Sequence, residues 1–391
     1  MKILVFEPSG GFWPYTPNIA QALGKVYIND EVIILTSENR KGSTIDNVTL
    51  RAECRGMEEN LKRSNQIKWL ANRVLCSLQW LSIRRKVIKE IKPNILHIQN
   101  TPTIFDQFIL PIIKKNTRII VTVHDVLPLM QTKIHSFKSL KKVYRTADEL
   151  IVHSASNKQE LINKMDIDKD NIHIIPHIMD NFEESKYLPS ETQAKEKLGL
   201  NQAYTYLLFF GSIRKSKGLD LAIKGLAVLQ ETMDKVCLLV AGSPHWDIDM
   251  DEINKLIRQN NLEEKVILQL GYIDDSMVDY YFIASKIILL PYIEFHSQSG
   301  VLLQAYKYKR PVIATNKGSL GETINDDQTG LVVEKLDPAL VAEKVKELLE
   351  NEKLYNTCAN NQEMVIEEKY NSNIIAKMTM SIYERDSKET L

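Results

Sequence analysis

Short runs rich in Val, Ile and Leu alternate with longer helix-forming stretches along the whole of this chain. The runs are continuously apolar, as is typical of parallel strands covered on both faces. Helical stretches between parallel strands predict right-handed crossovers. The pattern therefore predicts an α/β fold with doubly wound sheets. The predicted strands are residues 2–7, 31–36, 94–99, 118–124, 149–154 and 172–176 in the first half, and 205–211, 236–242, 265–271, 286–292, 310–315 and 330–334 in the second.

The length of the chain favours two domains, because 391 residues exceed what one hydrophobic core usually supports. The acidic, polar stretch 180–202 has little to bury and is interpreted as the connection between them. Ligands of doubly wound sheets bind beyond the carboxyl ends of the strands, so two facing sheets would share one central cleft. We predict Rossmann-like domains over residues 1–182 and 203–368, a linker over 183–202 and a final helical segment over 369–391.

The sequence shows neither a membrane span nor a cysteine motif. The opening MKILVFEP is too short an apolar run for a secretory signal, and no run of about 18 apolar residues could cross a bilayer. We therefore expect the protein in the cytoplasm. The cysteines are widely scattered, which predicts reduced thiols rather than a zinc or redox site. They are Cys54, Cys76, Cys237 and Cys358.

Basic residues are concentrated in the first half, although the net charge is zero. No acidic residue occurs between Glu59 and Glu90, and apolar residues recur there at helical spacing, which predicts a basic amphipathic helix over 61–92. Its basic face could rest on anionic lipid, as a peripheral contact with the inner face of a membrane. Alternatively, the helix packs on its own sheet with its charges in water. The basic residues are Lys62, Arg63, Lys68, Arg73, Arg84, Arg85, Lys86 and Lys89, and the apolar residues are Ile67, Leu70, Val74, Leu78 and Leu81.

Two strand–turn–helix segments, 209–226 and 291–324, carry the clearest binding signal. Each contains a glycine turn that aims free backbone N–H groups at an anionic ligand, and two such turns can hold one diphosphate. In the first turn, which begins at Gly211, we interpret Arg214 and Lys217 as phosphate ligands; a solvated basic loop is the alternative.

The second turn opens a helix with Ser299, Gly300 and Val301. Their backbone amides could bind the distal phosphate, whereas the alternative is a serine N-cap without a ligand.

The first half holds further candidates. Gly10 and Gly11 would let the backbone approach a phosphate or an acceptor closely. His124 should emerge at the carboxyl end of a strand, although a histidine in such a place is often structural. Asp125 could orient its ring or begin a turn, and His177 after IIP is a candidate of the same kind.

From Met1 to the final helix, these motifs resemble those of the family 4 retaining glycosyltransferases of the GT-B fold. The resemblance implies a first domain that binds the acceptor, a second that binds the nucleotide-sugar, and a last helix that crosses back toward the first domain. The resembling segments are 209–223 (FFGSIRKSKGLDLAI), 298–315 (QSGVLLQAYKYKRPVIAT) and 318–333 (GSLGETINDDQTGLVV), with 7–14 (EPSGGFWP), 121–125 (VTVHD) and 174–182 (IIPHIMDNF) in the first half.

The resemblance also implies roles for single residues. Arg214 and Lys217 would stabilise the leaving diphosphate; the family commonly has Arg where this chain has Ser212, and we assign that role to Arg214. His124 would hydrogen-bond the donor sugar. Glu322 would contact ribose or sugar, unless it only complements a helix dipole. Further implied donor contacts are Gly11, Gly211, Gly271 and Tyr272 (the last two at the nucleobase), Ser299, Gly300 and Val301.

The chain departs from the family at two acidic positions. The family typically carries two glutamates with seven residues between them, and this chain has His296 and Gln304 there. Gln304 can still hydrogen-bond ribose hydroxyls, because its amide both donates and accepts. His296 cannot supply a permanent carboxylate; Glu294 is a candidate substitute or simply a surface acid.

The resemblance implies a metal-independent hexosyltransferase that moves a sugar from a UDP- or GDP-sugar to a saccharide or lipid-linked acceptor in cell-surface polysaccharide biosynthesis, without cofactor or nucleic acid. The alternating Asp247, Asp249 and Asp251 are interpreted as a solvated loop or helix start rather than a metal site. A second hypothesis, from His296 and Gln304, is an inactive nucleotide-binding GT-B subunit that supports a partner enzyme. A nucleotide-sugar epimerase would need acid/base residues for which the sequence offers no clear candidates.

Overall fold

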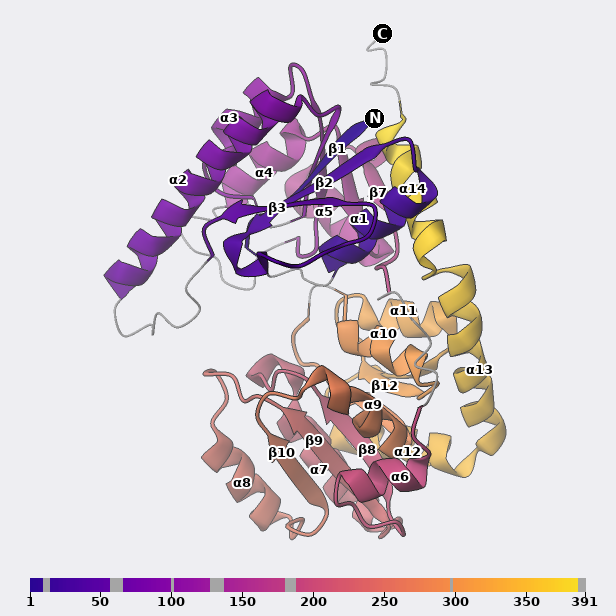
Figure 1. Cartoon of the computed structure of the whole chain (residues 1–391). Coiled ribbons are helices and arrows are strands. Elements are labelled where there is room, and N and C mark those ends of the chain that lie inside the picture. Colours follow the sequence, from indigo (N-terminus) through magenta and orange to yellow (C-terminus); the bar gives the residue numbers. More distant parts are fainter. Residues whose placement is uncertain are drawn as a thin grey trace. The chain divides into compact units, whose positions relative to one another are not determined.

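The computed structural model describes residues 1–9, 15–56, 66–99, 102–126, 137–179, 188–295 and 298–385. The chain divides into two compact units, each built around a parallel sheet (Figure 1). Within the described ranges, every helix is too short or too polar to span a lipid bilayer. The first unit comprises Met1–Asn181 with Lys369–Leu391, and the second comprises Phe182–Glu368.

In the described part of the first unit, seven parallel strands form the sheet in the order β3-β2-β1-β4-β5-β6-β7. The order reverses direction at β1, which is the signature of a doubly wound sheet. The strands are β1 (Lys2–Glu7), β2 (Glu31–Ser37), β3 (Thr49–Cys54), β4 (Ile95–Ile98), β5 (Arg118–Thr122), β6 (Glu149–Val152) and β7 (Ile172–Ile174).

Helices cover both faces of this sheet, because successive strand side chains point to opposite sides. Leu4 and Phe6 belong to the core under α2, α3, α4 and α5, whereas Ile3 and Val5 belong to the core under α1 and α14. The last helix, α14, packs against α1 and so completes the first unit. The helices are α1 (Tyr15–Val26), α2 (Gln66–Ile91), α3 (Asp106–Ile113), α4 (Phe137–Thr146), α5 (Ala155–Met165) and α14 (Ser372–Tyr383), with short turns η1 (Glu38–Arg40) and η3 (Lys169–Asn171).

The described part of the second unit has six parallel strands in the order β10-β9-β8-β11-β12-β13. One hydrophobic core of this unit packs α7, α8, α12 and α13 against the sheet. The strands are β8 (Thr205–Phe210), β9 (Val236–Gly242), β10 (Val266–Leu270), β11 (Ile287–Leu290), β12 (Val312–Thr315) and β13 (Gly330–Val333). The helices are α6 (Glu191–Lys197), α7 (Leu219–Gln230), α8 (Met250–Gln259), α9 (Asp275–Ala284), α10 (Gly300–Lys307), α11 (Leu320–Asp327), α12 (Pro338–Glu350) and α13 (Glu352–Glu368), with the turn η4 (Lys215–Lys217).

The predicted pair of doubly wound sheets is confirmed, and each predicted strand is present. The four cysteines are buried and free, as expected. One strand, β3, is absent from the predicted set. It lies at the sheet edge and carries Arg51 and Glu53, whose side chains pair at 2.6 Å, so it lacks the continuous apolar run of the other strands.

Residues 183–202 are interpreted from the sequence as a linker, but their described part also contains a helix. Helix α6 begins there with a capping box formed by Ser190 and Gln193, and it packs against α9. Residues 188–202 therefore contribute to the second unit.

The predicted basic helix is present as α2, although residues 61–65 lie outside the described residues, and its burial corrects the prediction. The sequence places Arg84 on the basic face, but Arg84 is only 1% exposed and pairs with Asp106 of α3. Asp106 is itself buried, so its carboxylate needs a cation, and Arg84 therefore points inward. Leu78, placed on the apolar face, is 47% exposed, and Leu75 is 56% exposed. The outer face of α2 is thus a mixture of leucines and cations.

Candidate functional site

The loop between β8 and α7 holds the predicted phosphate ligands. Gly211 begins it with a φ of 91° and Gly218 ends it with a φ of 70°, both in the left-handed region that glycine tolerates best. Between them, Arg214 is the N-cap of η4 and Lys217 is its last residue. Both side chains are partly exposed. The loop therefore presents two cations at the carboxyl end of a central strand.

Contacts with the loop after β11 hold this cationic loop in place. A Cβ on Gly218 would lie 2.0 Å from the carbonyl oxygen of Pro291, so only glycine allows this approach. The amide of Ile293 donates to the carbonyl oxygen of Ser216 at 2.9 Å. The two turns singled out in the sequence are thereby joined through their backbones.

Lys217 lies against the N-terminus of α10. A Cβ on Gly211 would be 3.4 Å from Lys217 Nζ and 3.6 Å from Val301 Cγ2, so these three residues meet. Lys217 Nζ also lies 5.5 Å from the centre of the Tyr292 ring, within cation–π range. The Tyr292 hydroxyl is 3.5 Å from Ser299 Oγ. One ammonium group, one aromatic ring and one helix terminus therefore form a single site.

The N-terminus of α10 has the form expected of an anion site. Ser299 is its N-cap, and Ser299 Oγ accepts a hydrogen bond from the amide of Leu302 at 3.3 Å. The N–H groups of Gly300 and Val301 fall in the first turn, where an α-helix offers no internal acceptor. Apart from its chain neighbours and its own helix backbone, no described atom lies within 4 Å of where a Cβ on Gly300 would stand. The first turn of α10 therefore faces open space at Gly300, which leaves room for a negatively charged group at this helix terminus.

Gln304 and Glu322 lie at the same edge of the second sheet. Gln304 follows Val301 by three residues on α10, which places both on one face of the helix. Glu322 is in the first turn of α11. The Thr315 hydroxyl, at the end of β12, donates to the Tyr292 carbonyl and so ties the loop before α11 to the loop before α10.

Gly271 and Tyr272 follow β10, two strands from the cationic loop. Gly271 has a φ of 133°, and its amide donates to the carbonyl oxygen of Gly242 at 3.0 Å. Tyr272 is 81% exposed. Two other predicted residues, Gly11 and His296, lie outside the described residues, as does Gly10.

The predicted His124 belongs to a cluster of imidazoles at the carboxyl edge of the first sheet. His124 follows β5, His153 follows β6 and His177 follows β7. His153 Nε2 lies 3.3 Å from His124 Nδ1, and His153 Nδ1 lies 2.9 Å from the carbonyl oxygen of Ile175. The ring of Tyr15, from α1, packs against the three imidazoles at centroid distances of 4.9, 5.4 and 4.5 Å. Asp125, next to His124, is partly buried.

Burial lowers the pKa of each of these histidines, because a charged imidazolium is poorly solvated there. The pKa of His153 falls to about 4, with its hydrogen bond to Ile175 opposing the shift, and that of His177 falls to about 3. The pKa of His124 is held well below its ordinary value by burial and then by the neighbouring histidines. The cluster is therefore neutral at pH 7.

His97, on β4, lies among the buried polar residues of the same unit. Its Nε2 is 2.7 Å from Thr122 Oγ1, and its Nδ1 is 2.5 Å from the hydroxyl of Tyr383 in α14. Burial lowers its pKa to about 3. His97, His153 and Tyr15 are not among the residues predicted from the sequence, although His153 follows an apolar strand just as His124 does.

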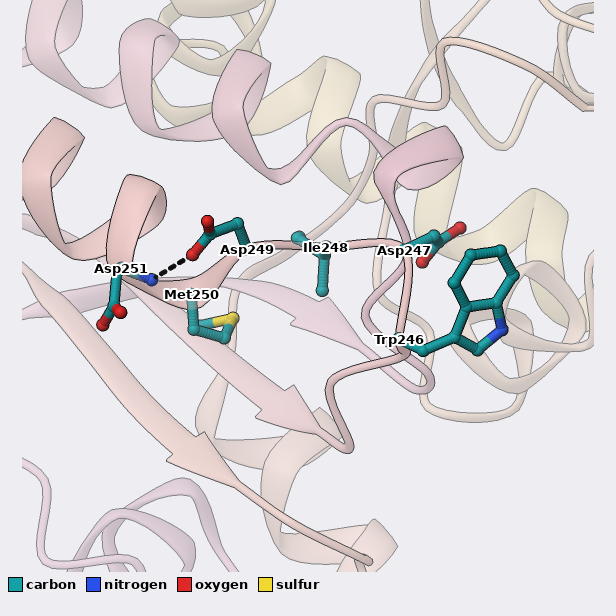
Figure 2. A pocket seen from close by; sticks show the side chains of 6 residues that line it. All are labelled: Trp246, Asp247, Ile248, Asp249, Met250 and Asp251. Atoms are coloured by element: carbon teal, nitrogen blue, oxygen red, sulfur yellow. Dashed lines mark hydrogen bonds between the residues drawn. The ribbon is translucent and has the colours of Figure 1, made fainter. Parts of the chain in front are cut away.

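In the acidic run of Asp247, Asp249 and Asp251, two carboxylates form hydrogen bonds within the loop and the start of α8. Asp249 is the N-cap of α8 and accepts from the amides of Asp251 and Glu252, and Asp247 Oδ1 lies 2.8 Å from His245 Nδ1. Figure 2 shows these carboxylates spread along an open hollow of about 500 Å³ beside Trp246, which is 65% exposed. Within the described part of the chain, no group of three or more His, Cys, Asp or Glu side chains is arranged to hold a metal ion.

Solved structures with a similar fold can be superposed on nearly the whole chain. Sucrose-phosphate synthase from Thermosynechococcus elongatus has a TM-score of 0.75 at 17% identity, with 98% of both chains covered. Anabaena Alr3699/HepE in complex with UDP-glucose has a TM-score of 0.70 at 14% identity, with 98% of this chain and 100% of that chain covered. At such identities the likeness shows the fold alone, and that fold is GT-B.

Family models match both units. The model "Glycosyltransferase Family 4" matches residues 10–181, and "Glycosyl transferases group 1" matches residues 190–364. The chain therefore belongs to the family 4 glycosyltransferases, as its motifs predict.

Curated relatives agree with this family. D-inositol 3-phosphate glycosyltransferase of Streptomyces scabiei is 26% identical over 207 residues, which are 51% of this chain and 46% of that protein. Capsular polysaccharide biosynthesis glycosyltransferase CapM of Staphylococcus aureus is 29% identical over 182 residues, 46% of each protein. The chain thus matches about half the length of these relatives.

Proposed function

We propose that this chain is a retaining glycosyltransferase that moves a hexose from a UDP- or GDP-sugar to a saccharide or lipid-linked saccharide in cell-surface polysaccharide biosynthesis. The observation that carries the proposal is the meeting of Lys217, Gly211 and the first turn of α10 at one edge of the second sheet. Family membership and the relative named for capsular polysaccharide biosynthesis support it.

Charge development explains why these groups suit the reaction. When the bond between the anomeric carbon and the diphosphate oxygen breaks, negative charge grows on the leaving nucleoside diphosphate. In the proposed complex, Lys217, Arg214 and the amides of Gly300 and Val301 stabilise that charge. Preorganised donors of this kind are usually the largest single contribution to lowering an enzymatic barrier, and removing one typically costs about 3 kcal/mol.

The same groups define how the configuration would be retained. The acceptor oxygen bonds to the anomeric carbon on the face from which the diphosphate leaves, and a leaving phosphate oxygen takes the acceptor's proton. His124 hydrogen-bonds the donor sugar in this proposal, Gln304 and Glu322 contact ribose or sugar hydroxyls, and Gly271 and Tyr272 lie at the nucleobase.

We also propose that Arg214 and Lys217 neutralise the diphosphate without a divalent cation. Two side-chain cations and two helix amides offer it enough positive charge for metal-independent transfer. Turnover should therefore persist in excess EDTA, and its loss there would contradict this part of the proposal.

A thermal-shift screen of the full chain against UDP-, GDP-, ADP- and dTDP-sugars tests the proposal. A ligand that binds only the folded state stabilises it by RT ln(1+[L]/Kd). We expect a UDP- or GDP-sugar to raise the Tm and then to be turned over with a saccharide acceptor. Tight nucleotide binding without hydrolysis or transfer would instead favour the inactive subunit suggested by His296 and Gln304.

We propose further that the protein acts in the cytoplasm, at an anionic membrane surface contacted by the outer face of α2. Leu75 and Leu78 are exposed there between Lys68, Arg85 and Lys89, so that face combines apolar and basic groups.

Liposome sedimentation tests this contact. Leu75→Ser with Leu78→Ser, or Arg85→Glu with Lys89→Glu, should abolish co-sedimentation with anionic vesicles. The control Lys197→Glu with Lys255→Glu makes the same charge change on exposed positions of the second unit and should keep it. No sedimentation of the unaltered protein would end the membrane proposal.

A further inference from the structure

We propose that Tyr292 is a positioning residue, whose ring face holds the ammonium group of Lys217 beside the N-terminus of α10 without neutralising it. In this position the ammonium meets the distal phosphate of a nucleoside diphosphate. The inference deepens the proposed function and rests on it for the identity of the ligand. Its structural part, the contact between ring and ammonium, lies wholly within the second unit.

The ring is the group that restrains the ammonium. Lys217 Nζ lies 5.5 Å from the centre of the Tyr292 ring, within the range of about 6 Å over which a ring face attracts a cation. Among the described residues, the Lys217 side chain forms no ion pair. A lysine stem has four rotatable carbons, so an unrestrained ammonium would sample many positions. The ring therefore limits where this charge can lie.

An aromatic face suits this task better than a carboxylate does. A carboxylate beside Lys217 would accept its N–H groups and offset its charge, so an incoming phosphate would have to compete with it. A ring carries no net charge, and the three N–H donors of the ammonium stay free for phosphate oxygens. The arrangement thus combines a fixed position with the full positive charge.

The ring is itself held firmly. Tyr292 is only 2% exposed, and the Phe295 ring meets it at a centroid distance of 5.0 Å with an interplanar angle of 66°. Its carbonyl oxygen accepts from the Thr315 hydroxyl, and its own hydroxyl lies 3.5 Å from Oγ of Ser299, the N-cap of α10. These contacts fix the ring relative to the helix terminus, and through the ring they fix the ammonium.

Two replacements of the same shape separate the electrostatic role of the ring from its packing. Tyr292→Phe keeps an electron-rich ring face. Trifluorophenylalanine at position 292 keeps the aromatic shape but withdraws electron density from that face, which removes its attraction for a cation. The two chains differ little in packing, so a difference between them reports on the ammonium of Lys217.

Tyr206 offers a matched control in the same unit. Its ring centre lies 5.6 Å from Lys195 Nζ, and Tyr206 is also 2% exposed. It is the second residue of β8, at the opposite end of that strand from the cationic loop. The same pair of replacements at position 206 therefore alters a similar contact away from the proposed phosphate site.

NMR of the full chain labelled with ¹³C-lysine detects the contact without any ligand. The signals that vanish in Lys217→Arg identify Lys217. Protons over a ring face are shifted upfield by the ring current. We expect such a shift for the Lys217 Cε protons in the unaltered protein and in Tyr292→Phe, and its loss in Tyr292→Leu. No upfield shift in the unaltered protein would overturn the proposal.

Calorimetric titration with UDP and GDP, and with UMP and GMP, tests the consequence for binding. Relative to Tyr292→Phe, the fluorinated chain should bind the diphosphate about tenfold more weakly, because the ammonium is no longer held. Binding of the monophosphate, which lacks the distal phosphate, should change little. In a Lys217→Ala background the two replacements should bind the diphosphate equally. The replacements at position 206 should not differ from each other.

The outcomes distinguish this inference from the proposed function. Equal diphosphate affinity in Tyr292→Phe and in the fluorinated chain would overturn the role of Tyr292 and leave the proposed function intact. Equal weakening of monophosphate and diphosphate would show a general distortion of the site, which also contradicts positioning at the distal phosphate. If neither UDP nor GDP binds the unaltered chain, the proposed function fails and the role in phosphate binding fails with it.

Discussion

Arg214 and Lys217 share their loop with a third cation, Lys215, and this allows a matched test. Lys215 is exposed, whereas Arg214 and Lys217 are partly buried. We expect Lys217→Ala and Arg214→Ala each to lower turnover about 100-fold or more, because each removes one proposed donor to the leaving group. Lys215→Ala removes the same charge from the same loop and should retain activity. Initial rates and calorimetric Tm values would be compared for the three variants.

In that comparison the Tm of Lys217→Ala should stay near that of the unaltered protein, since among the described residues its ammonium group lies near the Tyr292 ring and is in no ion pair. Unchanged turnover in Lys217→Ala or Arg214→Ala would remove that residue from the site.

Gly211 can be tested against a glycine with similar backbone strain. Gly211→Ala would place a Cβ at a φ of 91° and 3.4 Å from Lys217 Nζ, whereas Gly199→Ala would place one at a φ of 68° with no described atom within 4 Å apart from its chain neighbours. Both should lose about 1 kcal/mol of folding free energy, because an L side chain is strained there. Only Gly211→Ala should also weaken nucleotide-sugar binding, as measured by calorimetric titration. Equal affinities in both variants would show that the ligand does not approach Gly211.

The predictability of the site differs from residue to residue. Arg214 and Lys217 are visible in the sequence because two glycines within one turn mark a strained loop after a strand. His153 and Tyr15 are not, because their significance comes from contacts with His124 across separate strands and a helix. Burial of Arg84 is likewise invisible, since its partner Asp106 is on another helix.

At the scale of elements, α2 shows how one buried ion pair orients a helix. Arg84 pairs with Asp106 and lies 4.8 Å from the centre of the Phe6 ring, while its neighbour Arg85 is exposed. Arg84→Met should cost about 3–5 kcal/mol of unfolding free energy, because it leaves a buried carboxylate without its cation. Arg85→Met makes the same change one residue away and should cost about 0.5 kcal/mol or less. Urea unfolding would measure both, and similar values would show that the pair does not orient α2.

The strands were predictable because both faces of a parallel sheet are covered, so each strand is a continuous apolar run. The exception, β3, is an edge strand of the described sheet, next to β2. Its Arg51 pairs with Glu53 and with Glu90 of α2 instead of entering a core. Helix α6 is short and polar, and its packing on α9 depends on residues far away in the sequence.

For the molecule as a whole, the buried histidines predict sensitivity to acid. His97 and His153 have pKa values of about 3 and about 4 in the folded protein, against about 6.5 in an unfolded chain. Between these values the unfolded state binds protons that the folded state does not, so stability is full above pH 6.5 and falls as the pH drops toward 4. Each histidine should contribute about 1.4 kcal/mol per pH unit over that window.

Urea unfolding at a series of pH values would measure this slope, and His97→Gln should make it shallower. A stability that stays constant from pH 7 to pH 4.5 would contradict the prediction. The effect belongs to the fold of the first unit and is independent of any ligand.

The sequence by itself determined the alternation of strands and helices, the doubly wound class of the two sheets and the glycine turns that carry Arg214 and Lys217. These are local properties, because they depend on short apolar runs and on the conformational freedom of glycine. Only the tertiary structure decided that Lys217 meets the first turn of α10, that Arg84 turns inward and that His153 contacts His124. Those facts depend on atoms brought together from distant parts of the chain, and pairing, burial and hydrogen-bond direction exist only after the sheets have formed.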